Sequence, residues 1–184
     1  MSSDDNAVPV TLTQADPQGM ISLRGDLQNA ALQKVCIYIT GVAMPAKGQI
    51  VQMAGQAIAW MSPDELLIML PYQAVEGAVT QIGDALSGHH HLVANVSDAR
   101  VMMTLTGCGL RDVLAKLAPV DLHPDHFTVG QFRRTRLGQV AAAFWLSDPL
   151  TCHVICFRSV AAYCQDLLIS AAQHGRVDCH SRIL

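Results

Sequence analysis

The chain has 184 residues, 51% of them apolar and only 5% aromatic, and its formal net charge is −3. A chain of this length can bury about 70% of its unfolded surface, so it can form its own core. The isoelectric point near 6.2 argues against general binding to nucleic acid or to an anionic membrane. The acidic start MSSDDNAVPV has no signal-peptide pattern, and no apolar run reaches the ~18 residues of a membrane span.

The six cysteines are scattered along the chain without a CxxC pair. They are Cys36, Cys108, Cys152, Cys156, Cys164 and Cys179. Because they come with neither a paired spacing nor an oxidising address, we expect reduced thiols in a cytoplasmic protein.

The first half of the chain predicts a β-α-β-β-β-α unit followed by a return strand. Residues 1–19 include two prolines and a glycine and show no sustained period, so we expect a flexible arm there. Apolar periodicity then predicts strands at 20–24, 49–53, 56–61, 66–70 and 92–96, and helices at 27–37 and 72–86.

The second half repeats this order of elements. An offset of 82 residues relates Gly25 to Gly107 and also Gly48 to Gly130, so strand, helix and connection have equal lengths in both halves. The matching strands after the next turn end in Trp60 and Trp145. The second half predicts strands at 101–106, 130–137, 139–145 and 151–157, and helices from residue 110 to 117 and at 159–174.

We therefore expect an α+β fold made of internally duplicated β-α-β-β-β-α units with antiparallel-rich sheets. The pseudo-repeats would span 20–96 and 97–174. Neither unit could bury its apolar sheet face alone, so we expect one compact domain over 20–174, followed by a tail at 175–184.

A run of three histidines, His89 to His91, has the composition of a metal site. Adjacent residues of an extended segment point to alternating faces, so only His89 and His91 could share a metal ion. No second cluster lies nearby in sequence. We favour a solvated loop that enters the next strand.

A second polar group surrounds the proline-constrained turn at 121–126. Asp121, His123, Asp125 and His126 could hold a metal ion or transfer a proton. The alternative is structural, because Asp121 and His123 flank a turn in which short polar side chains bind backbone groups. We favour the structural turn.

Three arginines form the sharpest charge feature of the chain. On a strand, Arg134 and Arg136 share a face with Phe132, whereas Arg133 points the other way. One interpretation is a solvated edge strand that its charges protect from aggregation. The functional interpretation is a surface for an acidic partner, since arginine pairs well with carboxylates.

No pattern in the chain points to catalysis. The Gly107-Cys108-Gly109 turn lacks both the GxGxxG spacing and the GK[ST] ending of a phosphate-binding loop. Cys108 and Cys164 have no base next to them in sequence that could activate a thiol. We expect no catalytic, cofactor-binding or metal-binding residue on this chain.

Several segments together carry a resemblance to a known family. They are S-D-A-R at 97–100, L-A-K-L-A-P-V-D-L-H-P at 114–124, F-T-V-G-Q-F-R-R-T at 127–135, L-R-G-D at 23–26, A-W-M-S-P-D-E-L-L-I at 59–68 and F-R-S-V-A-A-Y at 157–163. This combination, which covers about residues 20–172, resembles the gamma subunit of heterotetrameric sarcosine oxidase.

The resemblance implies a fold like the folate-binding domain of aminomethyltransferases. It also implies a cytoplasmic bacterial complex of alpha, beta, gamma and delta chains that oxidises sarcosine to glycine, formaldehyde (or methylene-tetrahydrofolate) and hydrogen peroxide. FAD, FMN, NAD and tetrahydrofolate would belong to the partner chains, and the gamma chain would pack on alpha without a catalytic role.

Two other functions stay open from the sequence. An autonomous folate-dependent one-carbon protein of the same fold would need a carboxylate aimed at the pterin, with Asp98 or Asp121 as candidates. Nucleic-acid binding through residues 133–136 is disfavoured, because three arginines in an acidic chain make a small footprint and no aromatic stacking platform accompanies them.

Overall fold

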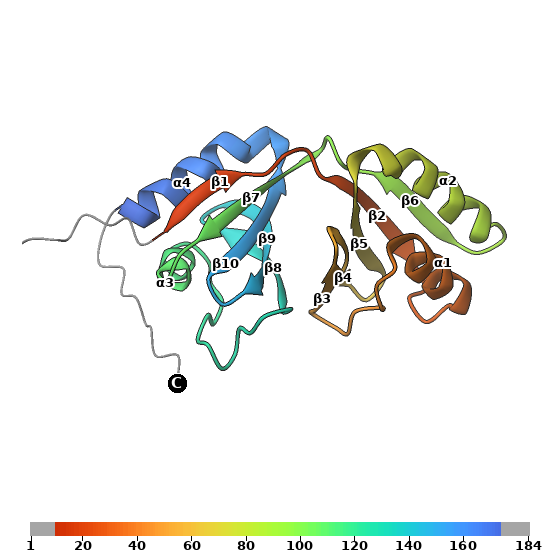
Figure 1. Ribbon diagram of the computed structural model, residues 1–184, viewed down its shortest axis with the longest axis horizontal. Coiled ribbons are helices and arrows are strands. Elements are labelled where there is room, and N and C mark those ends of the chain that lie inside the picture. Colours follow the sequence, from red (N-terminus) through yellow and green to blue (C-terminus); the bar gives the residue numbers. More distant parts are fainter. Residues whose placement is uncertain (1–9, 174–184) are drawn as a thin grey trace, which may run out of the picture. The chain divides into compact units, whose positions relative to one another are not determined.

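The computed structural model describes residues 10–173, which divide into two compact units (Figure 1). Within the described range, unit 1 comprises residues 10–15, 102–129 and 134–173, and unit 2 comprises residues 16–101 and 130–133.

Unit 2 is built on a five-stranded sheet with the strand order β3-β4-β5-β2-β6. All four neighbouring strand pairs of this sheet are antiparallel. Its strands are β2 (Gly19–Gly25), β3 (Ile50–Met53), β4 (Gln56–Ser62), β5 (Glu65–Leu70) and β6 (His91–Asn95). Its helices are α1 (Ala30–Thr40), a 3-10 turn η1 (Tyr72–Ala74) and α2 (Val75–Ala85).

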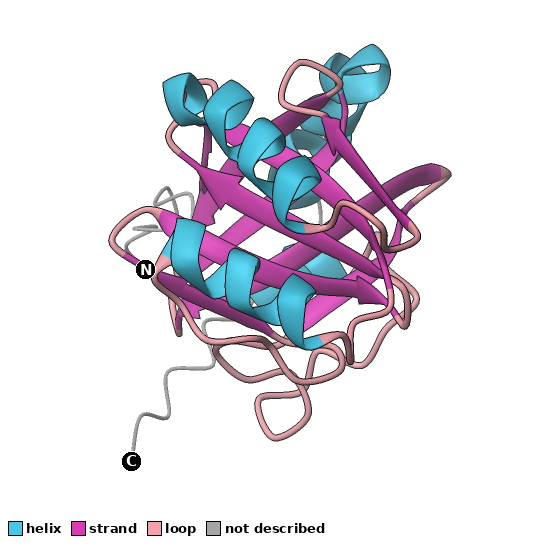
Figure 2. Ribbon diagram, turned by 90° about the vertical axis from the view of Figure 1, so that its right-hand side faces the viewer, coloured by secondary structure: helices cyan, strands magenta, loops and turns pink. Residues whose placement is uncertain are grey.

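Helices α1 and α2 lie side by side on one face of this sheet (Figure 2). The core between them joins Ile21, Ile58 and Ile68 of the strands to Leu32 and Ile82 of the helices. Every residue of β5 is buried, so this strand buries both of its faces. That burial explains why residues 66–70 form a continuous apolar run rather than an alternating pattern.

Helix α1 begins three residues later than the sequence predicts. The Asn29 side chain accepts hydrogen bonds from the backbone N–H groups of Ala31 at 2.8 Å and Leu32 at 3.4 Å, which makes Asn29 the N-cap. The apolar Leu27 lies in the turn before the cap and is buried there. Gly41, with φ at +67°, ends the helix in the left-handed region.

Unit 1 has a five-stranded sheet with the order β8-β9-β10-β7-β1. Its strands are β1 (Thr11–Gln14), β7 (Arg100–Thr106), β8 (Phe132–Leu137), β9 (Val140–Asp148) and β10 (Thr151–Phe157). Its helices are α3 (Leu110–Ala115), a 3-10 turn η2 (Arg158–Val160) and α4 (Ala161–Gln173). The first residues of β7 and β8 belong to unit 2.

The two sheets follow the same order of elements, and strand β1 takes the place in unit 1 that β6 has in unit 2. Strand β1 pairs antiparallel with β7, from Thr11 opposite Thr106 to Gln14 opposite Met103. The expectation of a flexible arm over residues 1–19 is therefore wrong for residues 11–14. This edge strand is short and mostly exposed, so it has no apolar alternation that would reveal it in the sequence.

The two tryptophans do not occupy equivalent places. Trp60 packs against the core cluster beneath α1 and α2. Trp145 lies opposite His153 in the β9–β10 pair. Its side chain is on the other face of the sheet from Phe144 and Cys156, which pack against Phe127 and against Cys164 of α4. The two-residue turns lie at 54–55 and 138–139, so Gly55 and Gly138 occupy different turn positions and the match of Trp60 to Trp145 is wrong by one residue.

One division between the compact units lies at 101/102, within β7, and the pseudo-repeats over 20–96 and 97–174 stay a prediction. A fusion of the halves into one compact domain stays a prediction, and the predicted tail at 175–184 lies outside the described residues. In the described part of the chain, no helix is both long and apolar enough to cross a membrane.

Candidate partner-binding surface

Strand β8 carries the three arginines that the sequence analysis singled out, and it forms one edge of its sheet. Arg134 and Arg136 are exposed, whereas Arg133 is half-buried. The ends of the strand, Phe132 and Leu137, are buried at 3% and 0% exposure and anchor it to the core. The predicted alternation thus separates the exposed Arg134 and Arg136 from the half-buried Arg133, although Phe132 at the start of the strand is buried.

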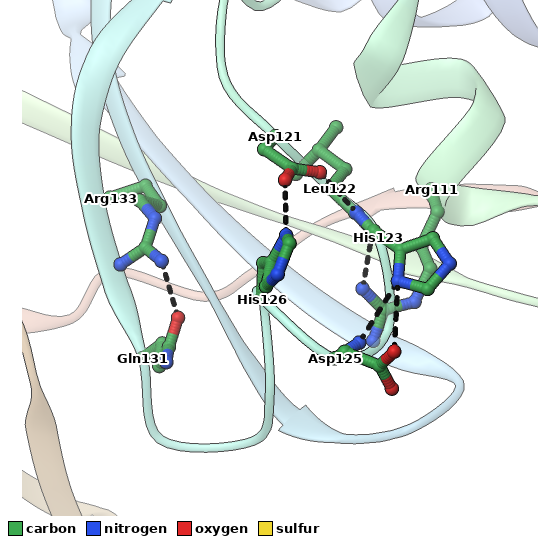
Figure 3. A network of polar contacts seen from close by, with 8 residues as sticks. All are labelled: Arg111, Asp121, Leu122, His123, Asp125, His126, Gln131 and Arg133. Carbon is green, nitrogen blue, oxygen red and sulfur yellow. Dashed lines mark hydrogen bonds and ion pairs between the residues drawn. The ribbon is translucent and has the colours of Figure 1, made fainter.

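The side chain of Arg133 has a partner two residues earlier in the chain. Its Nη2 donates a hydrogen bond to Oε1 of Gln131 (Figure 3). The backbone of the same stretch pairs with residues 48–50, because the N–H of Ile50 donates to Gly130 at 2.9 Å and the N–H of Phe132 donates to Gly48 at 2.8 Å. Arg133 is therefore held near the backbone, which leaves Arg134 and Arg136 as the accessible cations of β8.

The turn at 121–126 is organised by Asp121 (Figure 3). One carboxylate oxygen accepts the backbone N–H of His123 at 2.9 Å, and the other contacts Nδ1 of His126. The hydrogen bond from His123, followed by that from His126, lowers the pKa of Asp121 below its ordinary value. All three side chains are exposed, so these bonds shape a surface turn.

Arg111 ties this turn to the core of unit 1. Its Nη1 donates to the carbonyl of Leu122 at 2.8 Å, and its guanidinium lies 5.6 Å from the centre of the Phe127 ring. Phe127 in turn meets Phe144 edge-to-face at 5.5 Å. Partial burial lowers the pKa of Arg111 below its ordinary value, although arginine stays charged at neutral pH.

No metal site forms at either histidine cluster. In the range 10–173, no three His, Cys, Asp or Glu side chains come together in a way that would hold a metal ion. His89 Nδ1 instead lies 3.0 Å from Nδ2 of Asn29, and His91 Nδ1 lies 2.9 Å from the carbonyl oxygen of His89. These three side chains line a hollow of about 280 Å³ together with Asp26, Leu32, Leu86 and His90.

Two buried thiols, Cys36 and Cys152, are unsuited to nucleophilic chemistry. Burial raises the pKa of Cys36 to about 12 and that of Cys152 to about 12, so both are protonated at neutral pH. A hydrogen bond with Cys156, together with burial, raises the pKa of Cys164. Cys108 is disulfide-bonded, which corrects the expectation that all the cysteines are reduced.

The carboxylates proposed for an autonomous folate protein have other partners. Asp98 accepts hydrogen bonds from the hydroxyl of Tyr72 at 3.0 Å, and Asp121 belongs to the turn described above. Neither residue lines either of the two hollows described in unit 2. The geometry therefore does not favour that alternative.

Sequence reasoning missed a second surface, a groove of about 390 Å³ on unit 2 that we name the Trp60 groove. Its lining residues are Leu27, Gln28, Gln33, Met44, Pro45, Ala46, Lys47, Trp60, Pro63 and Leu66. They come from three separate stretches of the chain, 27–33, 44–47 and 60–66. Helical or strand periodicity could not bring them together, because it describes one element at a time.

Comparison with known proteins assigns the chain to a family. The model of the sarcosine oxidase, gamma subunit family matches residues 24–173. Sarcosine oxidase subunit gamma of Arthrobacter sp. is 29% identical over 139 residues, which cover 74% of this chain and 66% of that protein. The same subunit of Corynebacterium sp. (strain U-96) is 28% identical over 155 residues, 83% of this chain and 73% of that protein.

Solved structures agree with this assignment. A chain of heterotetrameric sarcosine oxidase from Corynebacterium sp. U-96, in complex with pyrrole 2-carboxylate, matches with a TM-score of 0.81 and 25% identity over 92% of this chain and 88% of that chain. Glycine cleavage system aminomethyltransferase T from Bartonella henselae shares the fold, with a TM-score of 0.62 and 13% identity over 87% of this chain and 45% of that chain. Since the family model spans most of its length, the chain belongs to the sarcosine oxidase gamma subunit family.

Proposed function

We propose that this chain is the non-catalytic gamma subunit of a heterotetrameric sarcosine oxidase. The observation that carries the proposal is the family match over residues 24–173, joined by a structural match that covers 92% of the chain. The complex would oxidatively demethylate sarcosine to glycine, with formaldehyde (or methylene-tetrahydrofolate) and hydrogen peroxide as the other products. Its cytoplasmic location follows from the same resemblance.

The chemistry of the described side chains supports a structural role for the chain. The buried thiols of Cys36 and Cys152 are held protonated by their raised pKa values. His153, the most enclosed histidine of the sheet in unit 1, has both ring nitrogens within 3.1 Å of hydroxyl groups on Thr104 and Ser147. Neither these two thiols nor His153 is poised for proton transfer to a substrate. In line with the family resemblance, we expect FAD, FMN, NAD and tetrahydrofolate on the partner chains.

The partner proposed for the chain is the alpha subunit, with beta and delta in the same complex. The exposed arginines of β8, Arg134 and Arg136, are our candidates for part of that contact. Arg136 has no hydrogen bond or ion pair with any described residue, so its guanidinium is available for a carboxylate of a partner. The half-buried Arg133 would support the strand rather than bind the partner directly.

We further propose that the two units arose by internal duplication. Strand, helix, three strands and helix follow one another in both, and the 3-10 turns η1 and η2 precede the last helix at the same place. Burial also recurs, since Ala78 and Ile82 of α2 correspond in order to Cys164 and Leu168 of α4. Strand β6 follows the first block and completes the sheet of unit 2. Strand β1 precedes both blocks and completes the sheet of unit 1.

Co-expression tests the proposed function. This chain, with an affinity tag, would be produced together with the alpha, beta and delta chains, and the purified material analysed by size-exclusion chromatography and mass spectrometry. We expect a four-chain complex of fixed stoichiometry. Recovery of the tagged chain alone, while the other three chains are soluble in the same cells, would refute the proposal.

A further inference from the structure

The Trp60 groove is the larger of the two hollows described above in unit 2, and paired backbone groups hold its walls. The backbone N–H of Trp60 donates to the carbonyl of Gln49 at 2.9 Å, and Trp60 lies opposite Leu66 in the β4–β5 pair. On the other wall, Nε2 of Gln33 donates to the carbonyl of Leu27 at 2.8 Å. The groove is thus built on paired strands and a capped helix, so its shape is present before any ligand arrives.

Most of the lining is apolar. Trp60, Met44 and Pro45 are each half-buried, so one side of each remains accessible from the groove, and Pro63 is exposed at its edge. Tryptophan and methionine are enriched at protein interfaces, and tryptophan is often a residue on which binding depends. A volume of about 390 Å³ suits one or two side chains of an extended segment rather than a folded element.

The groove has a single charged residue, Lys47. This lysine is exposed, and its ammonium makes no hydrogen bond or ion pair with any described residue. The nearby cation of β2, Arg24, differs because it is paired with Glu65 at 3.1 Å. An apolar hollow with one unpaired cation at its rim is complementary to an apolar side chain that has a carboxylate close to it.

We propose that the Trp60 groove binds an extended segment of the alpha subunit that places an apolar side chain against Trp60 and a carboxylate near Lys47. This inference rests on the proposed function for the identity of the partner. It goes beyond that function by assigning a second contact, separate in sequence from the arginines of β8.

The test compares matched substitutions in the binding of the full chain to the purified alpha, beta and delta assembly by biolayer interferometry. Lys47→Glu reverses the charge and Lys47→Arg keeps it. Ala46→Trp places a bulky ring in the groove, whereas Ala43→Trp adds the same ring to an exposed position of the same loop outside the lining. Thermal unfolding of each variant checks that the fold is retained.

We expect Lys47→Glu to lower the association rate about tenfold at low salt, with Lys47→Arg within about twofold of the unsubstituted chain. Ala46→Trp should raise the dissociation rate about tenfold, and Ala43→Trp should leave it unchanged. Unchanged binding by both Lys47→Glu and Ala46→Trp, or equal weakening by the two tryptophan variants, would overturn this inference and leave the proposed function standing. Absence of binding by the unsubstituted chain would overturn both.

Discussion

Gln49 and Gln131 form an isolated antiparallel bridge, and these two residues are separated by the same offset of 82 that relates Gly48 to Gly130. The flanking hydrogen bonds are reciprocal, because Ile50 donates to Gly130 at 2.9 Å and Phe132 donates to Gly48 at 2.8 Å. The donor of the second bond lies 82 residues after the donor of the first, and its acceptor lies 82 residues before the acceptor of the first. This symmetry is the pattern expected from the proposed internal duplication, with a residue pairing with its own counterpart.

The bridge predicts similar rates of amide hydrogen exchange for the two residues whose N–H groups donate the flanking bonds. Because the amides of Ile50 and Phe132 donate equivalent hydrogen bonds, we expect both to be protected, with exchange rates within about tenfold of each other. Amide exchange followed by NMR provides the measurement, and the exposed, unbridged amide of Thr128 serves as a reference. A Phe132 amide that exchanges as fast as Thr128 would contradict the pairing.

The two tryptophans should differ in their contribution to stability. Trp145 is only 2% exposed and its ring lies 5.2 Å from that of His153, whereas Trp60 is half-buried at its groove. We expect Trp145→Ala to lower the free energy of unfolding by about 3–5 kcal/mol, and Trp60→Ala to lower it less. Urea unfolding of the two variants measures the difference. Equal losses would mean that the Trp60 ring is as enclosed as that of Trp145.

Two glycines offer a matched pair of substitutions with opposite signs. A Cβ atom at Gly19 would lie 2.6 Å from the carbonyl oxygen of Leu70 and 2.6 Å from Cγ2 of Val75, so Gly19→Ala should destabilise the fold by about 1–3 kcal/mol. Gly77 lies within α2 and a Cβ there would meet nothing within 4 Å. Gly77→Ala should therefore stabilise the chain by about 0.5–1 kcal/mol. Thermal unfolding that ranks the two variants in the reverse order would show that the start of β2 is packed differently.

His153 should make stability depend on pH. Burial lowers the pKa of His153 below the ordinary value of 6.5. The unfolded chain therefore takes up a proton before the folded chain does, and stability is lost as the pH falls from about 6.5 towards the lower folded pKa. The loss is at most about 1.4 kcal/mol per pH unit, the limit for one proton.

The variant His153→Gln isolates this effect, because glutamine cannot titrate but can hydrogen-bond to Thr104 or Ser147. We expect its unfolding free energy to change less between pH 7 and pH 5 than that of the unsubstituted chain. Chemical denaturation at several pH values measures both proteins. If their unfolding free energies changed equally with pH, groups other than His153 would cause the dependence.

We expect the proposed contact of Arg134 and Arg136 with the partner assembly to depend on the salt concentration. The double variant Arg134→Glu, Arg136→Glu should keep its melting temperature, because both side chains are exposed. It should bind the partner assembly more weakly, and the difference should shrink as salt rises, since exposed charges are screened. Co-purification followed at two ionic strengths measures this effect. Undiminished recovery at low salt would remove these arginines from the interface.

The sequence predicted most elements because their periodicity reflects burial. Strand β10 was predicted at its observed bounds, and the alternation along β8 separated Arg134 and Arg136 from the half-buried Arg133. The bonds of Asp121 to His123 were predictable as well, because a short carboxylate beside a proline turn has nearby backbone donors. Local rules were sufficient in these three cases.

Other features depended on contacts that no local pattern contains. Strand β1 is held by pairing with β7, about ninety residues later in the chain, so its own four residues carry little signal. The match of Trp60 to Trp145 failed because the glycine is the second turn residue in one hairpin (Gly55) and the first in the other (Gly138). The Trp60 groove escaped because its lining comes from separate segments.

The most direct test of the account is an omission experiment on the assembled enzyme. Sarcosine-dependent formation of hydrogen peroxide would be measured for the alpha, beta and delta chains with and without this chain, and for this chain alone. The account predicts no peroxide from this chain alone, and a three-chain preparation that loses assembly or activity and regains it when this chain is added. A three-chain enzyme that is stable and fully active without it, or a chain that oxidises sarcosine by itself, would contradict the assignment as a non-catalytic gamma subunit.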